Sequence, residues 1–248
     1  MAPMKRVLSI AVVLVALTSA STAVADDGAG PFGVTVTAGQ GAGSARVGVL
    51  VPADRATRPA GGHFCTASVV RAPYRNLVVT AAHCLDGRGE LVFVPGYRDG
   101  RAPYGVWKVK RRFLPRGWVA GRREDSDVAF AVVEPRGGKG VEDVVGGYRI
   151  ATGTATGATA VTLTGYPDSR ETPISCTNKP TTHSPTQQRI ECPGFAGGTS
   201  GSPWVNGDGQ VVGILGGHDD GGTTPDVSYS VVLGAEVERL YREAAGDP

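Results

Sequence analysis

A serine surrounded by glycines is the first feature of this sequence that could carry chemistry. The stretch GGTSGSPW, residues 197 to 204, places three glycines and a proline around Ser200. This composition is typical of a surface loop. It also suits a nucleophile turn, because glycines let backbone N–H groups and a hydroxyl converge on one point. Serine is a weak nucleophile without a base beside it, so the second interpretation requires a base and a group that orients it.

The candidate base is His83, one of four histidines, in the stretch LVVTAAHC. A histidine at the end of a strand is more often a satisfied or exposed polar residue. Here Cys84 follows directly, and a disulfide at that position would fix the turn that carries the imidazole, as a general base requires. Histidine titrates near pH 6.5 when unperturbed, which suits proton transfer near neutrality.

The candidate orienting group is Asp127 in the stretch EDSDVAFAVV. A carboxylate that holds the proton on one imidazole nitrogen leaves the other nitrogen free to accept a proton. Asp127 directly adjoins the apolar run from Val128 to Val133, whereas Glu124 and Asp125 do not. A solvated aspartate at the start of a strand is the alternative interpretation.

The N-terminus has the order of a secretory signal peptide, which we expect to cover residues 1 to 25. Lys5 and Arg6 precede the apolar run from Val7 to Leu17, and the small residues Ala23 and Ala25 precede the expected cleavage site. The apolar run is too short to span a bilayer. We therefore expect a secreted, extracellular protein that does not remain in a membrane.

The four cysteines are an even number, which favours two disulfides in an exported chain. We favour the pairs Cys65–Cys84 and Cys176–Cys192 because each closes a short local loop, although the sequence alone permits three pairings. In the chain-entropy model a loop of this size stabilises the fold by about 3 kcal/mol.

The rest of the chain reads as many short β-rich runs with turn residues between them, which predicts an all-β fold. A segment rich in Gly, Ala and Thr, residues 26 to 44, predicts a linker or short propeptide. Two sets of β runs follow in residues 45–140 and 141–248, and they meet at a glycine-rich break, so we expect two β-barrels with a cleft between them. The helical pattern from Gly234 to Ala245 predicts one C-terminal helix. The expected strands are Val47–Val51, Cys65–Val70, Leu77–Thr80, Leu91–Val94, Val106–Val109, Val128–Val133, Arg149–Ile150, Ala160–Thr164, Arg189–Cys192, Val211–Leu215 and Val227–Val232.

The overall charge gives no indication of a nucleic-acid or membrane partner. Lys and Arg number 25 and Asp and Glu number 23, for a net charge of +2, and 41% of the residues are hydrophobic. A balance this close to zero does not predict binding to polyanions or anionic lipids. We expect a monomer.

Three blocks in chain order, TAAHC, DVAF and GGTSGSPW, resemble the signature blocks of the chymotrypsin/trypsin-like serine peptidases, particularly their secreted bacterial branch. The resemblance covers approximately residues 47 to 233. It implies two six-stranded antiparallel β-barrels packed face to face, with the site in the cleft between them. It also implies a serine endopeptidase that acts on polypeptides through an acyl-enzyme intermediate, without a metal or another cofactor.

The resemblance assigns a role to each candidate residue. Ser200 is the nucleophile, His83 is the general base and later acid, and Asp127 orients His83. The backbone N–H groups of Gly198 and Ser200 form the oxyanion hole. The stretch from Leu215 through Gly216 to Gly217 is similar to the edge that pairs with the substrate backbone.

Two further residues are candidates for selecting the substrate side chain before the scissile bond. His218 lies near, but shifted from, the place of a histidine in the glutamate-specific bacterial members. Asp226 would favour Arg or Lys if it lies in the specificity pocket, and it is a turn aspartate after Pro225 otherwise.

The sequence departs from the family pattern at two places. Thr199 stands where animal members carry the Asp that binds a new N-terminal ammonium, so we expect activation without that ion pair. The family also supports its buried Asp with a serine, whereas the matching stretch here contains Ile214 and Leu215. The group that supports Asp127 is therefore left open.

Three other functions fit parts of the pattern. A catalytically silent, peptidase-like binding module would usually lack a member of the triad. A serine esterase of the α/β-hydrolase type would carry Gly-x-Ser-x-Gly, whereas Ser202 occupies the fifth position here. A zinc hydrolase using His63, Cys65, His83 and Cys84 lacks the usual ligand spacing.

Overall fold

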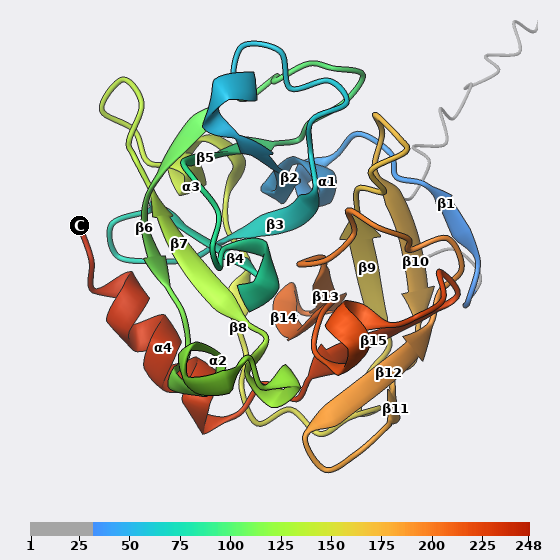
Figure 1. The fold of residues 1–248 in the computed structure, drawn as a ribbon. Coiled ribbons are helices and arrows are strands. Elements are labelled where there is room, and N and C mark those ends of the chain that lie inside the picture. The colour runs from blue at the N-terminus through green and yellow to red at the C-terminus, as the bar shows by residue number, and fades with distance from the viewer. Residues whose placement is uncertain (1–31) are drawn as a thin grey trace, which may run out of the picture.

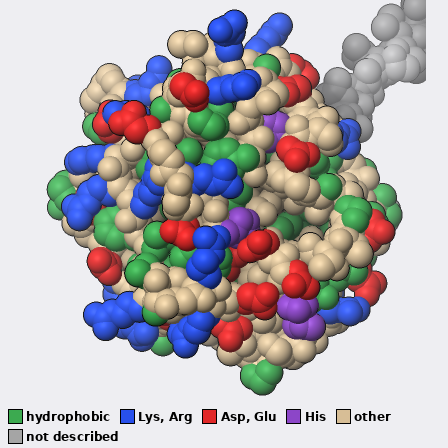
Figure 2. Space-filling view, in the orientation of Figure 1, with side chains coloured by type: hydrophobic (Ala, Val, Ile, Leu, Met, Phe, Trp, Pro, Cys, Tyr) green, Lys and Arg blue, Asp and Glu red, His purple; other side chains and the backbone are tan. Residues whose placement is uncertain are grey.

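The computed structural model describes residues 32–248 as two β-rich halves side by side (Figure 1). The predicted signal peptide, residues 1–25, lies outside the described residues. Basic and acidic side chains are interspersed over the face in Figure 2. In chain order the elements are β1 (Thr35–Thr37), α1 (Ala42–Arg46), β2 (Val47–Pro52), η1 (Ala53–Arg55), β3 (Cys65–Val70), β4 (Leu77–Thr80), η2 (Ala82–Cys84), β5 (Leu91–Pro95), β6 (Trp107–Phe113), α2 (Arg116–Gly121), η3 (Glu124–Ser126), β7 (Ala129–Val133), α3 (Val141–Val145), β8 (Arg149–Ile150), β9 (Val161–Gly165), β10 (Ile174–Asn178), β11 (Thr181–Thr182), β12 (Gln187–Glu191), β13 (Pro203–Asn206), β14 (Gln210–Ile214), η4 (His218–Gly221), β15 (Val227–Val231) and α4 (Ala235–Ala245).

The first half forms a closed barrel in the strand order β2-β3-β4-β7-β6-β5. Strands β3, β4, β5 and β7 are buried along their whole length. Strands buried on both faces read as continuous apolar runs instead of alternating ones, which is why the sequence marks them clearly. The barrel carries His83 and Asp127 at the ends of two neighbouring strands, β4 and β7.

The prediction of a second closed barrel is wrong, because the second half consists of open sheets. One sheet has six strands in the order β1-β10-β9-β13-β14-β8, and the other has three in the order β11-β12-β15. Side chains form hydrogen bonds with backbone groups of β14 that would otherwise pair with the neighbouring strand to close a barrel. Ser230 Oγ accepts the N–H of Ile214 at 2.8 Å, and Gln188 Nε2 donates to the carbonyl of Val212 at 3.1 Å. Among the described residues, the backbone pairing between the two sheets at this edge is limited to an isolated bridge between Leu215 and Ser230.

The two halves exchange elements at both ends of the described chain. Strand β1 lies within the segment predicted as a linker or propeptide, yet it pairs antiparallel with β10 of the second half, with Thr35 opposite Cys176. At the other end, α4 packs against β7 of the first barrel, and Val237, Leu240 and Ala244 are buried. The C-terminal helix follows the predicted bounds to within one residue, and Figure 1 shows it beside β6 and β7.

Candidate active site

The imidazole of His83 is fixed by the turn that follows β4. That strand ends at Thr80, and His83 lies in the short 3₁₀ turn η2. Cys84 forms a disulfide with Cys65 at the start of β3, and the second disulfide joins Cys176 and Cys192. The His83 side chain is 12% exposed, so part of the ring remains accessible to solvent.

Asp127 is completely buried and accepts three hydrogen bonds. Its Oδ2 accepts from His83 Nδ1 at 2.7 Å and from the backbone N–H of Gly217 at 2.8 Å, while Oδ1 accepts from the backbone N–H of His83 at 3.0 Å. A buried carboxylate requires such donors, because desolvation of an unpaired charge is costly. A carboxylate is an acceptor only, so the proton of His83 lies on Nδ1 and the lone pair lies on Nε2.

The backbone around Asp127 aims its carboxylate at His83. The N–H of Val128 donates to the carbonyl of Ser126 at 2.9 Å, and Asp127 has φ −83° and ψ 56°, which is an inverse γ-turn. Glu236 of α4 stabilises this turn, because its Oε2 accepts a hydrogen bond from Ser126 Oγ at 2.8 Å. The C-terminal helix therefore supports the loop that carries Asp127.

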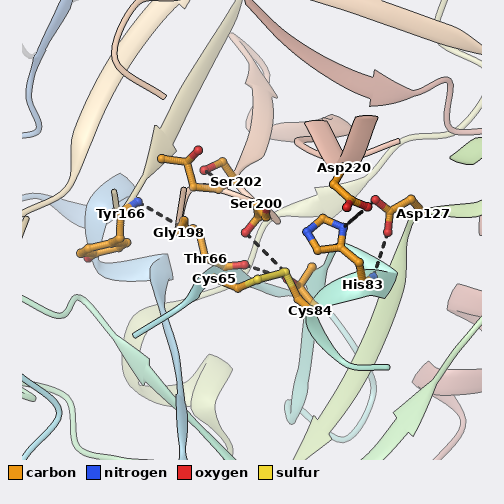
Figure 3. The surroundings of a disulfide bond; sticks show 12 residues. Cys65, Thr66, His83, Cys84, Asp127, Tyr166, Gly198, Ser200, Ser202 and Asp220 are labelled. Carbon is orange, nitrogen blue, oxygen red and sulfur yellow. Dashed lines mark hydrogen bonds and ion pairs between the residues drawn. A yellow bond between two sulfur atoms is a disulfide. The ribbon is translucent and has the colours of Figure 1, made fainter. Parts of the chain in front are cut away.

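Ser200 lies across the imidazole from Asp127, on the loop between β12 and β13 (Figure 3). The backbone N–H of Thr66 donates to the carbonyl of Ser200 at 2.8 Å, and Thr66 directly follows Cys65 of the disulfide to Cys84. The loop of Ser200 and the turn of His83 are thus held by the same short segment of β3.

Close backbone packing explains the glycines beside Ser200. Gly198 and Gly201 have φ values of +90° and +86°, a conformation that favours glycine. A Cβ at Gly201 would lie 2.1 Å from the carbonyl oxygen of Thr66, and one at Gly198 would lie 2.5 Å from the backbone nitrogen of Asp168. A side chain at Gly201 would force the loop away from β3, and one at Gly198 would force it away from residues 166–168, which follow β9.

Two backbone N–H groups in the loop of Ser200 are unpaired within the described residues. Within residues 32–248, the backbone N–H groups of Gly198 and Ser200 have no hydrogen-bond acceptor. The hydroxyl of Thr66 fixes the loop between them: it donates to the carbonyl of Gly198 and accepts from the N–H of Tyr166, each at 3.0 Å. Burial raises the pKa of the Tyr166 phenol, with Arg98 opposing the shift, so the phenol stays neutral.

The predicted substrate edge lies against Asp127. The N–H groups of Leu215 and Gly216 donate to the backbone carbonyls of Ser202 and Tyr229, respectively. The N–H of Gly217 donates to the side-chain Oδ2 of Asp127. Among the described residues, the carbonyl of Gly216 has no donor, which leaves it available to an extended peptide.

The two candidate specificity residues lie in different surroundings. His218 stacks on His183 with ring centroids 4.7 Å apart, and its Nδ1 lies 3.4 Å from Glu124 Oε2. Asp226 is exposed at a turn closed by a bridge between Thr224 and Val227. The exposure of Asp226 fits the alternative of a turn aspartate.

The structure does not support zinc ligation by the residues considered for it. Cys65 and Cys84 form a disulfide, so neither offers a thiolate. His63 is buried, with Nε2 at 3.0 Å from the carbonyl of Pro167.

Sequence reasoning missed the support for Asp127 and the roles of Thr66 and Glu236. The support is a backbone N–H, which every residue except proline carries and which no residue type marks. Thr66 could have been noticed only as the neighbour of Cys65.

The two-lobed β fold, with a buried Asp-His pair beside the half-buried Ser200, is the arrangement typical of serine peptidases. Residues 65–214 match the family described as a trypsin-like peptidase domain, and the chain belongs to this family. No helix among residues 32–248 is long and apolar enough to cross a membrane.

Relatives with a known structure or activity agree with this assignment. The chain is 32% identical to the glutamyl endopeptidase of Bacillus licheniformis over 135 residues, which span 51% of this chain and 41% of that protein. The structure is similar to protease Anisep from Arthrobacter nicotinovorans, with a TM-score of 0.70 and 28% identity, over 82% of this chain and 96% of that one. It is also similar to the thermostable serine protease AL20 from an extremophilic microorganism, with a TM-score of 0.71 and 28% identity, over 84% and 100%.

Proposed function

We propose that this protein is a secreted serine endopeptidase with Ser200, His83 and Asp127 as its triad. The observation that carries the proposal is the His83 imidazole, which lies between a buried carboxylate and an accessible serine (Figure 3). Export agrees with the predicted signal peptide and with two disulfides, since disulfides persist in oxidising compartments.

In the first half of the reaction, Ser200 Oγ attacks the carbonyl carbon of the scissile bond and its proton passes to His83 Nε2. The oxygen that becomes negative accepts hydrogen bonds from the N–H groups of Gly198 and Ser200. The C–N bond then breaks as the imidazolium gives its proton to the leaving amine. Asp127 stabilises the imidazolium without taking its proton.

In the second half, water attacks the acyl-enzyme and gives a proton to His83. The bond between the carbonyl carbon and Ser200 Oγ then breaks, and His83 returns the proton to the serine. Each free oxyanion donor is worth about 3 kcal/mol of transition-state stabilisation.

The substrate preference of the Bacillus relative does not follow for this chain. His218, the candidate for binding a glutamate side chain, lies between two carboxylates, since its Nε2 is 3.2 Å from Asp219 Oδ2 and its Nδ1 faces Glu124. An incoming glutamate would meet like charges there. We propose that glutamate is not the preferred residue before the scissile bond.

Labelling with a fluorophosphonate probe tests the triad. We expect one labelled site, Ser200, no labelling of Ser200→Ala, and labelling of His83→Ala slowed at least ~10³-fold. Ser169→Ala, which changes an exposed serine, is the matched control and should label normally. Wild type that labels but cleaves no peptide library would exclude the endopeptidase, and wild type that does not label would favour a silent binding module.

A further inference from the structure

A second carboxylate, which the proposed mechanism does not use, lies beside the catalytic imidazole. Asp220 Oδ1 is 3.8 Å from His83 Nδ1, and the Asp220 side chain is 75% exposed, whereas Asp127 is completely buried. Asp220 belongs to η4, which begins directly after Gly217 of the substrate edge. Figure 3 shows Asp220 above the imidazole ring, on the opposite side from the Cys65–Cys84 disulfide.

Asp220 is part of a patch without a fixed cation. We call Glu124, Asp125, Asp219 and Asp220 the acidic rim. Within residues 32–248, none of the four lies within 4.0 Å of an Arg or Lys nitrogen, and histidines are their only ion-pair partners. Acidic side chains gather between the purple patches at the centre and lower right of Figure 2. The negative potential on this side of the cleft is therefore available to a ligand.

The ligand of this cleft is independently indicated, because the family is one of peptidases and its substrates are polypeptides. A peptide paired with the edge at Gly216 is extended, and successive side chains of an extended chain point to opposite sides. If the residue before the scissile bond points into the specificity pocket, the preceding residue points toward His83 and Asp220.

We propose that Asp220 selects substrates with Arg or Lys at the second residue before the scissile bond. This inference rests on the proposed endopeptidase function. The guanidinium or ammonium group pairs with the free oxygen of Asp220, and the remaining carboxylates of the acidic rim add a weaker, screened attraction. The carboxylate of Asp220 thus recognises a cation on a flexible side chain of the substrate, next to the imidazole.

The backbone of η4 offers a conservative variant for the test. Asp219 and Asp220 have φ values of +48° and +54°. Asparagine is, after glycine, among the residues that best tolerate this left-handed region. Asp220→Asn therefore removes the charge and keeps the turn. Asp208→Asn, in the distant turn between β13 and β14, is the matched control.

The experiment compares peptides that carry Arg or the uncharged isostere citrulline at the second residue before the bond. The measured quantity is the kcat/KM for the Arg peptide divided by that for the citrulline peptide. An effect of Asp220 on the imidazole changes both values equally and cancels in this ratio. We expect a ratio of about fivefold at low ionic strength. The ratio should fall toward one in Asp220→Asn and in high salt, and it should not change in Asp208→Asn.

Binding to Ser200→Ala, measured by fluorescence anisotropy with the same two peptides, separates recognition from catalysis. Tighter binding of the Arg peptide than of the citrulline peptide, lost in Asp220→Asn, would support the inference even if the wild type cleaved neither peptide. The absence of cleavage would overturn only the proposed function. Cleavage without a preference for Arg over citrulline, or a preference that survives in Asp220→Asn, would overturn the inference and leave the endopeptidase standing.

Discussion

Replacement of Thr66 tests whether its hydroxyl holds the loop of Ser200 in place. Thr66 is completely buried, and its Oγ1 donates to the carbonyl of Gly198 and accepts from the N–H of Tyr166. Thr66→Val keeps the shape of the side chain but leaves both backbone groups buried without a partner. At about 1.5 kcal/mol for each group, the free energy of unfolding should fall by about 3 kcal/mol.

Thr66→Ser is the control, because it keeps the hydroxyl and removes one buried methyl group. That change should cost about 1 kcal/mol. Urea unfolding followed by tryptophan fluorescence measures both variants, and a Ser200→Ala background prevents autolysis. The expected order of stability is wild type, then Thr66→Ser, then Thr66→Val.

Thr66→Val should also slow the reaction at Ser200, because the Gly198 peptide, which carries one of the two proposed oxyanion donors, becomes less fixed. Loss of such a donor costs about 10²–10³-fold in rate, so a partly loosened donor should slow fluorophosphonate labelling by about tenfold or more. A Thr66→Val variant as stable as Thr66→Ser, with wild-type labelling, would refute this account of the loop.

Two other substitutions address the carboxylate of the proposed triad and the stability at alkaline pH. Gly216→Ala should lower kcat at least ~10-fold, because the new Cβ would lie 2.7 Å from Asp127 Oδ2. Gly207→Ala is the control, because a Cβ at that position would have no other heavy atom within 4 Å. Burial raises the pKa of Tyr148 to about 12, with Arg46 opposing the shift. The unfolded chain then loses this proton above pH 10 while the folded protein keeps it, so stability falls between pH 10 and 12 by up to about 3 kcal/mol. Tyr148→Phe should lessen that fall in urea unfolding measured across this range, and an unchanged alkaline loss would refute the assignment.

The sequence predicts the strands of the first barrel better than those of the second half. β3 and β4 have the predicted bounds, because strands buried on both faces show as continuous apolar runs. Strand β10, with the sequence ISCTN, was missed because polar residues alternate with apolar ones over only five positions. Strand β1 was missed because its pairing with β10 depends on a partner about 140 positions away, which local composition does not reveal.

Motifs predict which residues carry the chemistry, but not how the backbone holds them. His83 and Asp127 are 44 positions apart, and the structure places their side chains 2.7 Å from each other. Their order along the chain and the blocks around them were visible in the sequence. The threonine hydroxyl that fixes Gly198 was not, because Thr66 also has the β propensity expected of any residue in β3.

The support of Asp127 shows why the matching stretch was misjudged. The family pattern predicts a side-chain donor at Ile214 or Leu215, but in the structure Gly216 lies against the carboxylate and the N–H of Gly217 donates to it. A Cβ at Gly216 would lie 2.7 Å from Asp127 Oδ2, so glycine at this position leaves the space that the carboxylate occupies. The paired glycines are therefore the replacement for the missing serine: one clears the space and the next supplies the hydrogen bond.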